Sequence, residues 1–494
     1  MPLAEAAATS AISFLWAIPF VALLVTIGVM PLVHKHWWEK GYPWITLALA
    51  VVGSSYYFLG KGDLHRWIEG MEEYVSFIIL LAALFVVSGG IAINVTRQGT
   101  PLANSVLLLI GAALANLFGT TGAAMLLIRP YLRMNERHLK PYHVVFFIFI
   151  VANVGGSLTP IGDPPLFLGY LMGVPFWWVF QHMHGVWLLV VGLLLLIFFI
   201  LDTADHRREE RHRPNDVGPT VGIVGIHNFL FILVVVAAVF QPGAFSLVHS
   251  RSGLALLGNL ALSREVLMVA AAVASWLVTS GTIYKRNQFS FAPIREVTIL
   301  FAGIFATMIP AIQFMQANAA SLPLKTPGQV YFVSGVLSSL LDNAPTYKTF
   351  VDTRLAEIPV DDVVAARTVL KAMSAAHSTE IPADLPPGRV RHALEAVARY
   401  HSGDVLSANV SDEELRIGFL IGVPAWSIYL FAISASSVLW GACTYIGNGP
   451  NLMIKSIADA AGANSPSFGS YMLKYTLPVL IPIYILVWAI YLRG

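Results

Sequence analysis

Two aspartates lie inside long apolar stretches, where an ionised carboxylate is costly. Asp163 belongs to the segment TPIGDPP (159–165), and Asp342 belongs to the segment LLDNAPT (340–346). An ionised aspartate near the centre of a membrane helix costs about 2.5–3.5 kcal/mol on insertion scales, so such residues mainly pair, titrate or bind an ion. A carboxylate that holds either a proton or a metal cation couples the two by competition. We therefore predict that Asp163 and Asp342 bind a transported cation.

Side chains with oxygen atoms accompany both aspartates, and oxygen is the ligand that hard cations prefer. They lie in the two aspartate segments and in apolar segments with similar sequences. The predicted ligands with an oxygen atom, besides the two aspartates, are Asn116, Thr120, Thr121, Asn153, Ser157, Thr159, Asn343, Thr346, Thr444, Asn448 and Asn451. Lys348 is also a predicted ligand, but its ammonium group would bind an anionic substrate.

Structural roles would also explain several of these residues. Asp163 could cap the half-helix that starts at Pro164, because aspartate is a favoured N-cap residue. Asp342 could form an ion pair with Lys348, six residues further on. Small polar side chains also hydrogen-bond between membrane helices, which is the alternative for Asn116, Thr120, Thr121, Asn153 and Ser339.

Glycine and proline interrupt two apolar stretches at places where a helix cannot continue. The expected hinge residues are Gly156, Gly162, Pro164 and Pro165 in the first stretch, and Gly441, Gly447, Gly449 and Pro450 in the second. A break frees carbonyl oxygens, which suit a cation, and exposes a helix N-terminus, which attracts an anion. The residues alone therefore allow a cation, an anion or both.

The interrupted stretches are two copies of one unit. Residues 156–168 align with residues 441–453 without gaps, five of the thirteen positions are identical, and Asp163 matches Asn448. Upstream of each, residues 114–127 align with residues 337–350. Inverted repeats with discontinuous helices are typical of secondary transporters, whose binding site lies at the repeat interface.

The hydropathy pattern predicts an all-α polytopic membrane protein with about ten transmembrane spans plus two re-entrant hairpins. The hairpins are expected at 101–128 and 330–350, and the broken helices at 142–181 and 415–458. We divide the chain into N-terminal transmembrane helices (1–73), a first repeat (74–201), a charged cytoplasmic linker (202–222), connecting and scaffold helices (223–294) and a second repeat (295–492) with a soluble insertion at 351–414.

Basic clusters predict the orientation in the membrane, because they favour the cytoplasmic side. They occur at Lys35–Lys40, at Arg129–Lys140, at Arg207–Arg213 and at Lys285–Arg286. All four fall on one side if 101–128 is a re-entrant hairpin and 142–181 crosses the membrane once. Both termini are then expected outside, in a bacterial inner membrane. We interpret Glu265 and Glu296 as surface charges at helix entrances, and Trp178 as part of the interfacial aromatic belt.

Composition restricts the class of protein. Of the 494 residues, 56% are hydrophobic and 12% charged, whereas soluble domains carry about 25% charged residues. A water-soluble enzyme is therefore excluded. The net charge of +2 gives no sign of a nucleic-acid partner, and the single cysteine, Cys443, excludes an internal disulfide. We expect no resident cofactor. The expected partners are the lipid bilayer, a cation and a proton, and a second copy of the chain; a carboxylate is a further partner if the chain carries an organic anion.

The sequence resembles the ion-transporter superfamily of NhaD-type sodium/proton antiporters, arsenite-pump membrane subunits, and citrate and dicarboxylate carriers. The segment FGTTGAAMLLIRP (118–130) is similar to the first hairpin of that family, and LLDNAPT is similar to the second. TPIGDPP and TYIGNGPN (444–451) resemble its broken helices. The resemblance implies an inverted-repeat fold with a scaffold and a transport domain, often dimeric, that moves by an elevator-like shift. Thr120 and Thr121 stand where an Asn-Asp pair is common in the family.

Three functions are compatible with these features. The first is sodium/proton antiport, with Asp342 as the shared ligand, Asn343, Thr444 and Asn448 in support, and Asp163 as a second titrating ligand. The second is cation-coupled carriage of citrate or another carboxylate, held by the half-helix N-termini and Lys348. The third is an intramembrane aspartyl protease, which is disfavoured because proline occupies position 160 of the required Gly-x-Gly-Asp motif.

Overall fold

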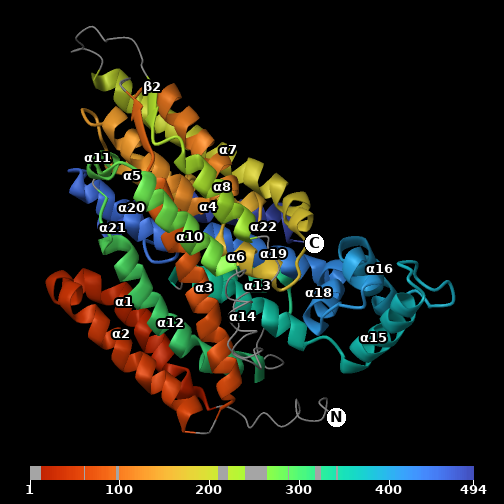
Figure 1. Cartoon of the computed structure of the whole chain (residues 1–494). Helices are drawn as coiled ribbons and strands as arrows, with labels where there is room; N and C mark the ends of the chain where they lie inside the picture. The colour runs from red at the N-terminus through yellow and green to blue at the C-terminus, as the bar shows by residue number, and fades with distance from the viewer. Residues whose placement is uncertain are drawn as a thin grey trace.

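The computed structural model describes residues 13–59, 62–95, 99–209, 221–239, 264–287, 289–317, 324–340 and 343–493 (Figure 1). Within these ranges, seven helices are long and apolar enough to cross a membrane, and two shorter apolar helices accompany them. The chain is therefore an integral membrane protein, as its hydropathy predicts.

One set of helices, which we call the first helical group, packs as neighbouring pairs. Helix α12 contacts α2 and α3, while α10 contacts α3 and α8. Phe77 of α3 stacks on Phe301 of α12 with ring centroids 5.1 Å apart. The group comprises α1 (Ile18–Val33), α2 (Lys35–Phe58), α3 (Leu64–Gly89), α8 (Asn228–Val239), α10 (Arg264–Val278) and α12 (Ala292–Ala317), with the short η2 (Phe14–Trp16) and α11 (Gly281–Arg286) at its ends.

A buried charge joins α3 to α10 in this group. Glu265 is only 4% exposed and accepts hydrogen bonds from Ser76 at 2.7 Å and from Arg264 at 2.8 Å. The expectation of a surface charge at Glu265 is therefore wrong. The neighbouring guanidinium and the serine hydroxyl supply the partners that a buried carboxylate requires.

The remaining membrane helices form what we call the second helical group, which contains both interrupted stretches. In the first half these elements are α4 (Pro101–Met134), α5 (Pro141–Ile150), η3 (Val154–Leu158), α6 (Pro164–Leu171) and α7 (Phe176–Glu209). In the second half they are α13 (Pro327–Leu340), α14 (Asn343–Ala356), α19 (Pro424–Trp440), η6 (Gly441–Cys443), α20 (Gly449–Ala460), α21 (Phe468–Tyr471), the π-helical η7 (Met472–Leu480) and α22 (Ile481–Tyr491).

Helix α4 folds back on itself. Gly119 at its middle has φ 75° and ψ 156°, a conformation that breaks the helix and favours glycine. The amide of Gly99, just before α4, donates to the carbonyl of Met134 at its end, 2.7 Å away. Since both ends of the segment lie together, the chain reverses at Gly119.

Helices α13 and α14 also bring their outer ends together. Arg354, near the end of α14, donates to the carbonyl of Leu324, just before α13, at 3.2 Å. The connection between them contains Asp342, which lies outside the described residues. The two segments predicted as hairpins therefore both begin and end in one place.

The two interrupted stretches have the same local conformations. Each runs from a helix through a short 3₁₀ turn and an extended segment into a second helix. The dihedral angles of Thr159 (φ −135°, ψ 154°) match those of Thr444 (φ −140°, ψ 168°). Asp163 (φ −146°, ψ 143°) and Asn448 (φ −154°, ψ 135°) also match.

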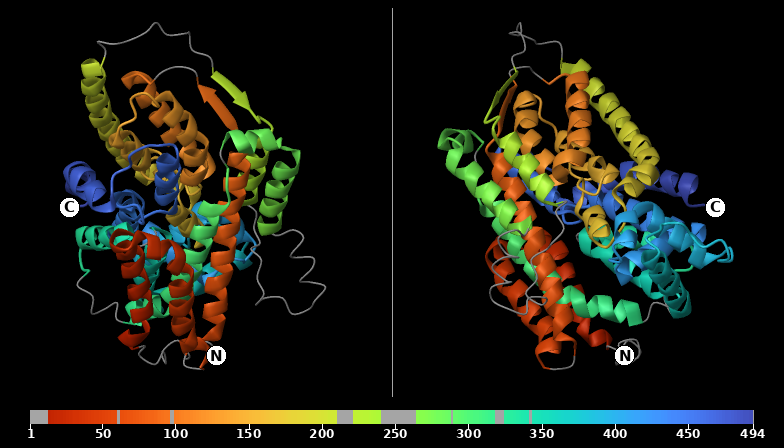
Figure 2. Two further views of the ribbon diagram at one scale, coloured as in Figure 1. Left: turned by 90° about the vertical axis from the view of Figure 1, so that its left-hand side faces the viewer. Right: turned by 45° about the vertical axis from the view of Figure 1, so that its right-hand side comes forward.

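Four shorter helices form a lobe beside the membrane helices, on the side opposite α1 and α2 (Figures 1 and 2). Ser411 begins the last of them with a capping box, in which its hydroxyl accepts from the amide of Glu414 and the Glu414 carboxylate accepts from the amide of Ser411. This last helix packs against the second one. The lobe contains α15 (Val360–Ala375), α16 (Arg389–Tyr400), α17 (Ser402–Leu406) and α18 (Asp412–Gly422).

The described chain also contains a small sheet that the all-α prediction did not include. Strands β1 (Ala92–Val95) and β2 (Val221–Val224) pair antiparallel, with Ala92 opposite Val224 (Figure 2). Their valines and isoleucines favour extended backbone. Helix α3 therefore ends at Gly89 and the chain continues as a strand.

Candidate functional site

The carboxylate of Asp163 is the centre of a buried polar cluster. The side chain is 1% exposed. Its Oδ1 accepts from the hydroxyl of Thr120 at 2.9 Å and from the amide of Asn448 at 3.3 Å. Its Oδ2 accepts from the amide of Asn343 at 2.5 Å. These three donors come from three separate helices and carry no charge.

Each of these four residues stands at the N-terminal end of a helix. Thr120 follows the break at Gly119, Asn343 is the first described residue of α14, and Asp163 and Asn448 precede the first turns of α6 and α20. The Asp163 side chain makes no capping hydrogen bond to α6, so a capping role does not account for it. A helix N-terminus carries a partial positive charge, so these ends jointly stabilise negative charge at this point.

Equivalent positions of the two copies make equivalent contacts. The hydroxyl of Thr159 donates to the carbonyl of Asn116 at 2.7 Å, and the hydroxyl of Thr444 donates to the carbonyl of Ser339 at 2.5 Å. Asp163 and Asn448 occupy the same position in the alignment of 156–168 with 441–453, and their side chains contact one another directly. The copies therefore meet through the residues that align.

Three buried asparagines connect the two breaks. The amide of Asn153 donates to Asn451 at 2.7 Å, and the amide of Asn448 donates to Asn153 at 3.1 Å. The amide of Asn451 also donates to the carbonyls of Gly441 and Thr444, each at 2.9 Å. These bonds satisfy carbonyl groups that the broken helix leaves without an intrahelical partner.

Other predicted ligands hold backbone instead. The amide of Asn116 donates to the carbonyl of Gly155 at 2.6 Å, and its oxygen accepts from the amide of Leu158 at 2.9 Å. Ser157 donates to the carbonyl of Val154 within η3. Asn116 and Ser157 therefore shape the first break. Thr121 and Thr346 are buried close to Thr120 and Asn343 in sequence, at 4% and 2% exposure.

Lys348 forms ion pairs with two acidic residues that the sequence analysis did not consider. Its Nζ lies 3.4 Å from Glu73 of α3 and 3.8 Å from Asp352 of α14. The expected pairing with Asp342 concerns a residue outside the described ranges, so the role predicted for Asp342 stays a prediction.

The hinge residues differ in how tightly they are enclosed. A Cβ atom added at Gly162 would lie 2.0 Å from the carbonyl oxygen of Gly156, and one at Gly447 would lie 2.7 Å from that of Gly441. A Cβ at Gly449 would meet nothing within 4 Å. Pro164, Pro165 and Pro450 occupy the first turns of α6 and α20, where a missing amide hydrogen does no harm.

Two cavities reach the cluster. The larger, of about 170 Å³, lies between α12 and α20 and is lined by Glu296, Asn448 and Ser456 among others. The smaller, of about 30 Å³, lies against α3 and is lined by Thr120 and Gly162 among others. Glu296, interpreted from the sequence as a surface charge, thus lines a cavity that leads to Asn448.

A second buried network was missed by the sequence analysis. Asp202 is 5% exposed, accepts from Asn104 and from Tyr142 at 2.9 Å each, and lies 3.2 Å from Nε2 of His143. It joins α4, α5 and α7 near the first turn of α4. The sequence did contain a sign of this network, because Asp202 follows an apolar run directly. We assigned Asp202 to the linker 202–222 instead.

One protein family matches nearly the whole chain. A family described as "putative citrate transport" matches residues 9–492, which includes both interrupted stretches and the lobe. This match confirms the resemblance to citrate-transporter-like members of the ion-transporter superfamily. No curated protein matches the chain.

Proposed function

The chain belongs to this transporter family, and we propose that it is a cation-coupled carrier of citrate or a similar carboxylate, with Asp163 as the coupling residue. The observation that carries the proposal is the meeting of four helix N-termini at the Asp163 carboxylate. Helix N-termini bind carboxylates and phosphates in many proteins. Here they already face one carboxylate, which belongs to the protein.

Coupling follows from charge balance at this point. While Asp163 is ionised, its negative charge compensates the partial positive charges of the helix ends. When a cation or a proton neutralises Asp163, the same helix ends favour a second negative group. A substrate carboxylate and the cation therefore stabilise each other's binding, which is the thermodynamic requirement for symport.

Oxygen ligands for the cation are available beside Asp163. The Oδ1 atom of Asn343 is buried and has no hydrogen-bond partner in the described part of the chain. It belongs to the amide whose nitrogen holds Asp163. We propose that Asp163, Asn343 and the hydroxyl of Thr120 contribute ligands, with Asp342 from the adjoining connection as a further candidate.

The architecture supports a transporter of the inverted-repeat type. We propose that 101–128 and 330–350 are re-entrant hairpins and that the interrupted stretches are the broken helices of two inverted repeats. The matching conformations of Thr159 and Thr444, and of Asp163 and Asn448, support this proposal. Breaks of this kind normally form the substrate site.

Sodium/proton antiport is the second candidate. It is favoured by the neutrality of the donors that hold Asp163, because a carboxylate held by neutral donors can exchange a proton for a cation. In antiport the cation moves without an organic anion, whereas the carrier requires both. The two functions therefore differ in one measurable property.

Solid-supported-membrane electrophysiology on proteoliposomes tests the proposal. We expect a sodium or proton gradient to drive a current only when citrate or another di- or tricarboxylate is present. Asp163→Asn should abolish the current, while the exposed Asp384→Asn in the lobe should leave it unchanged. A sodium current without any carboxylate would establish antiport instead. Absence of carboxylate-dependent current from folded protein in every gradient would overturn the carrier proposal.

A further inference from the structure

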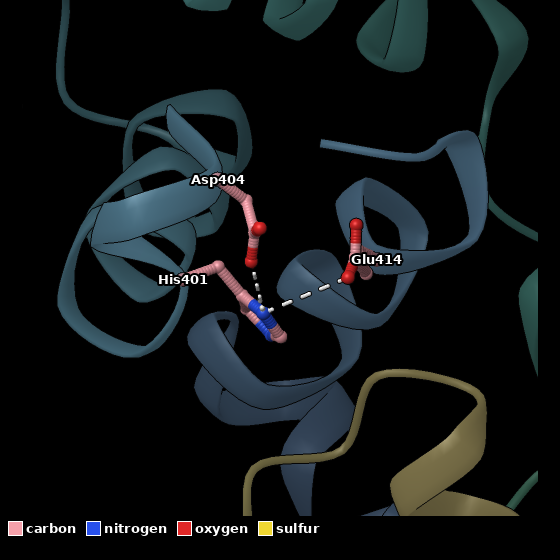
Figure 3. Close-up of side chains that lie close together, drawn as sticks. All are labelled: His401, Asp404 and Glu414. Carbon is pink, nitrogen blue, oxygen red and sulfur yellow. Dashed lines mark ion pairs between the residues drawn. The ribbon is translucent and has the colours of Figure 1, made fainter. Parts of the chain in front are cut away.

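Three side chains of the lobe converge on one point, apart from the Asp163 cluster (Figure 3). His401 precedes α17, Asp404 lies in α17, and Glu414 lies in the first turn of α18. Nδ1 of His401 lies 3.7 Å from Oδ2 of Asp404 and 3.9 Å from Oε1 of Glu414. One nitrogen and two carboxylate oxygens all lie within 4.8 Å of one another.

A backbone carbonyl on the far side of the imidazole ring orients His401. Its Nε2 lies 3.0 Å from the carbonyl oxygen of Gly173, which can only accept a hydrogen bond. Nε2 therefore carries the hydrogen and donates it, which leaves Nδ1 of a neutral imidazole with its lone pair directed at the two acids. A backbone carbonyl that fixes the far nitrogen is the usual support of a metal-ligating histidine.

The glutamate is oriented in a similar way. Its Oε2 accepts from the amide of Ser411 at 2.7 Å and from the Ser411 hydroxyl at 2.9 Å. These capping bonds occupy one oxygen and leave Oε1 directed at His401. Two of the three side chains are therefore held in position by groups outside the trio.

The distances fit a shared ion better than direct hydrogen bonds. An N–H···O bond between His401 and either acid would require about 2.7–3.2 Å, which is shorter than both separations. Ligands of a tetrahedral zinc ion, at about 2.0–2.2 Å from the metal, lie about 3.4 Å from one another. Separations of 3.7 and 3.9 Å need only a small contraction to reach that value.

We propose that His401, Asp404 and Glu414 form a binding site for a divalent transition-metal ion of the zinc class. One imidazole and two carboxylates are a ligand set suited to such an ion, and a water molecule would complete four-coordination. The side chains are 13%, 47% and 25% exposed respectively, so the ion can enter from water.

The site joins the lobe to the first interrupted stretch. Gly173 follows α6, the half-helix that begins beside Asp163, and a Cβ at Gly173 would lie 2.9 Å from Cγ of Glu414. This close approach brings the lobe against the end of α6. A metal ion at this position fixes α17 and α18 to each other and, through His401, to the chain after α6.

The test uses the full-length protein, purified in detergent and stripped with a chelator. We expect titration calorimetry to show one equivalent of Zn²⁺ bound and the melting temperature to rise by about 3 °C or more, with little effect of Mg²⁺. His401→Gln and Asp404→Asn should each weaken Zn²⁺ binding about 100-fold or more. His377→Gln, at an exposed histidine of the same lobe, should have no effect.

Asp404→Asn protects the test against a folding failure, since Asp404 is half-exposed and takes no part in the capping box. Zn²⁺ binding should also weaken as the pH falls, because protons compete with the metal for Nδ1. If the wild-type protein binds no stoichiometric Zn²⁺, or if both variants bind it as tightly as wild type, the proposal is wrong. The trio is then a polar contact within the lobe and not a metal site.

Discussion

Three of the groups that hold the Asp163 carboxylate are neutral donors, and this bears on the cation site proposed there. A lysine or arginine at hydrogen-bond distance would compete with an incoming cation for the carboxylate. A hydroxyl and two amides stabilise the charge without opposing the ion. Asparagine also offers an oxygen, so Asn343 can turn from a donor to the carboxylate into a ligand of the cation. The chemistry of the site thus favours exchange over a permanent ion pair.

Thr120 provides the cleanest test at the residue scale. Thr120→Val keeps the shape of the side chain but removes the hydroxyl that donates to Asp163. A hydrogen bond to a charged group contributes about 1.5–3 kcal/mol, and about 1.4 kcal/mol corresponds to a tenfold change in affinity. We expect at least a tenfold rise in the cation concentration that half-saturates transport in proteoliposomes.

The adjacent threonine is the matched control for this prediction. Thr121 is equally buried and lines the smaller cavity, but its hydroxyl does not bond to Asp163. Thr121→Val should therefore change the half-saturating concentration less than threefold. Equal effects of the two substitutions would show that packing at the break, and not the bond to Asp163, governs cation binding.

At the scale of elements, the breaks depend on the close approach of two glycines. Gly162→Ala would place a methyl group 2.0 Å from the carbonyl oxygen of Gly156. The backbone at Gly162 cannot move away easily, because its carbonyl also accepts a hydrogen bond from the amide of Thr120 at 2.8 Å. Overpacking of this kind costs about 1–3 kcal/mol or more. We expect a lower melting temperature and loss of transport.

Gly449→Ala makes the same chemical change in the second break at a position with open space around it. Its melting temperature should stay within about 1 °C of wild type, since substitutions without new contacts change stability by at most about 0.5 kcal/mol. The comparison is made by differential scanning fluorimetry of the two variants in the same detergent. A Gly162→Ala protein as stable as Gly449→Ala would contradict the tight packing.

The sequence predicted those elements whose cause is local. Gly156, Gly162 and the following prolines disfavour a continuous helix when they occur close together, so the breaks were predictable from the local clustering of these residue types. The alignment of Asp163 with Asn448 also indicated which residues would meet. The donation from Asn343 to Asp163 needed only the further assumption that the copies face each other.

Other features depend on which helix faces which, and hydropathy does not contain that information. Trp178 was assigned to the lipid interface but is 1% exposed, because α7 packs its side chain inside the protein. Asp202 was assigned to a linker, yet α7 continues to Glu209 and Asn104 approaches it from α4. An apolar or charged residue near the end of a span gives the same sequence pattern whether its side chain faces lipid, water or another helix.

For the whole molecule, the two cavities differ in size in a way that bears on transport. The cavity beside Asn448 is more than five times larger than the one beside Thr120, at about 170 against 30 Å³. Each lies between the first helical group and one of the two interrupted stretches. Alternating access requires that one route to the site be open while the other is closed. We interpret the route past α12 and α20 as the wider of the two.

Cysteine accessibility tests this interpretation, because the chain has one cysteine, Cys443, and it is buried. In a Cys443→Ala background, Ser456→Cys places a thiol in the larger cavity and Thr121→Cys places one in the smaller. A charged methanethiosulfonate reagent should modify position 456 at least about ten times faster than position 121 without substrate. Saturating cation and citrate should reduce that ratio, because binding shifts the population towards the other state.

The reference position for these rates is Asp384→Cys, on the exposed surface of the lobe, where substrate should change nothing. It corrects for direct effects of citrate or sodium on the reagent. If the ratio of rates at positions 456 and 121 stays the same with and without substrate, the two cavities are not alternative routes to Asp163. If the ratio is reversed from the start, the larger cavity is closed to water in the resting protein and the smaller one is the open route.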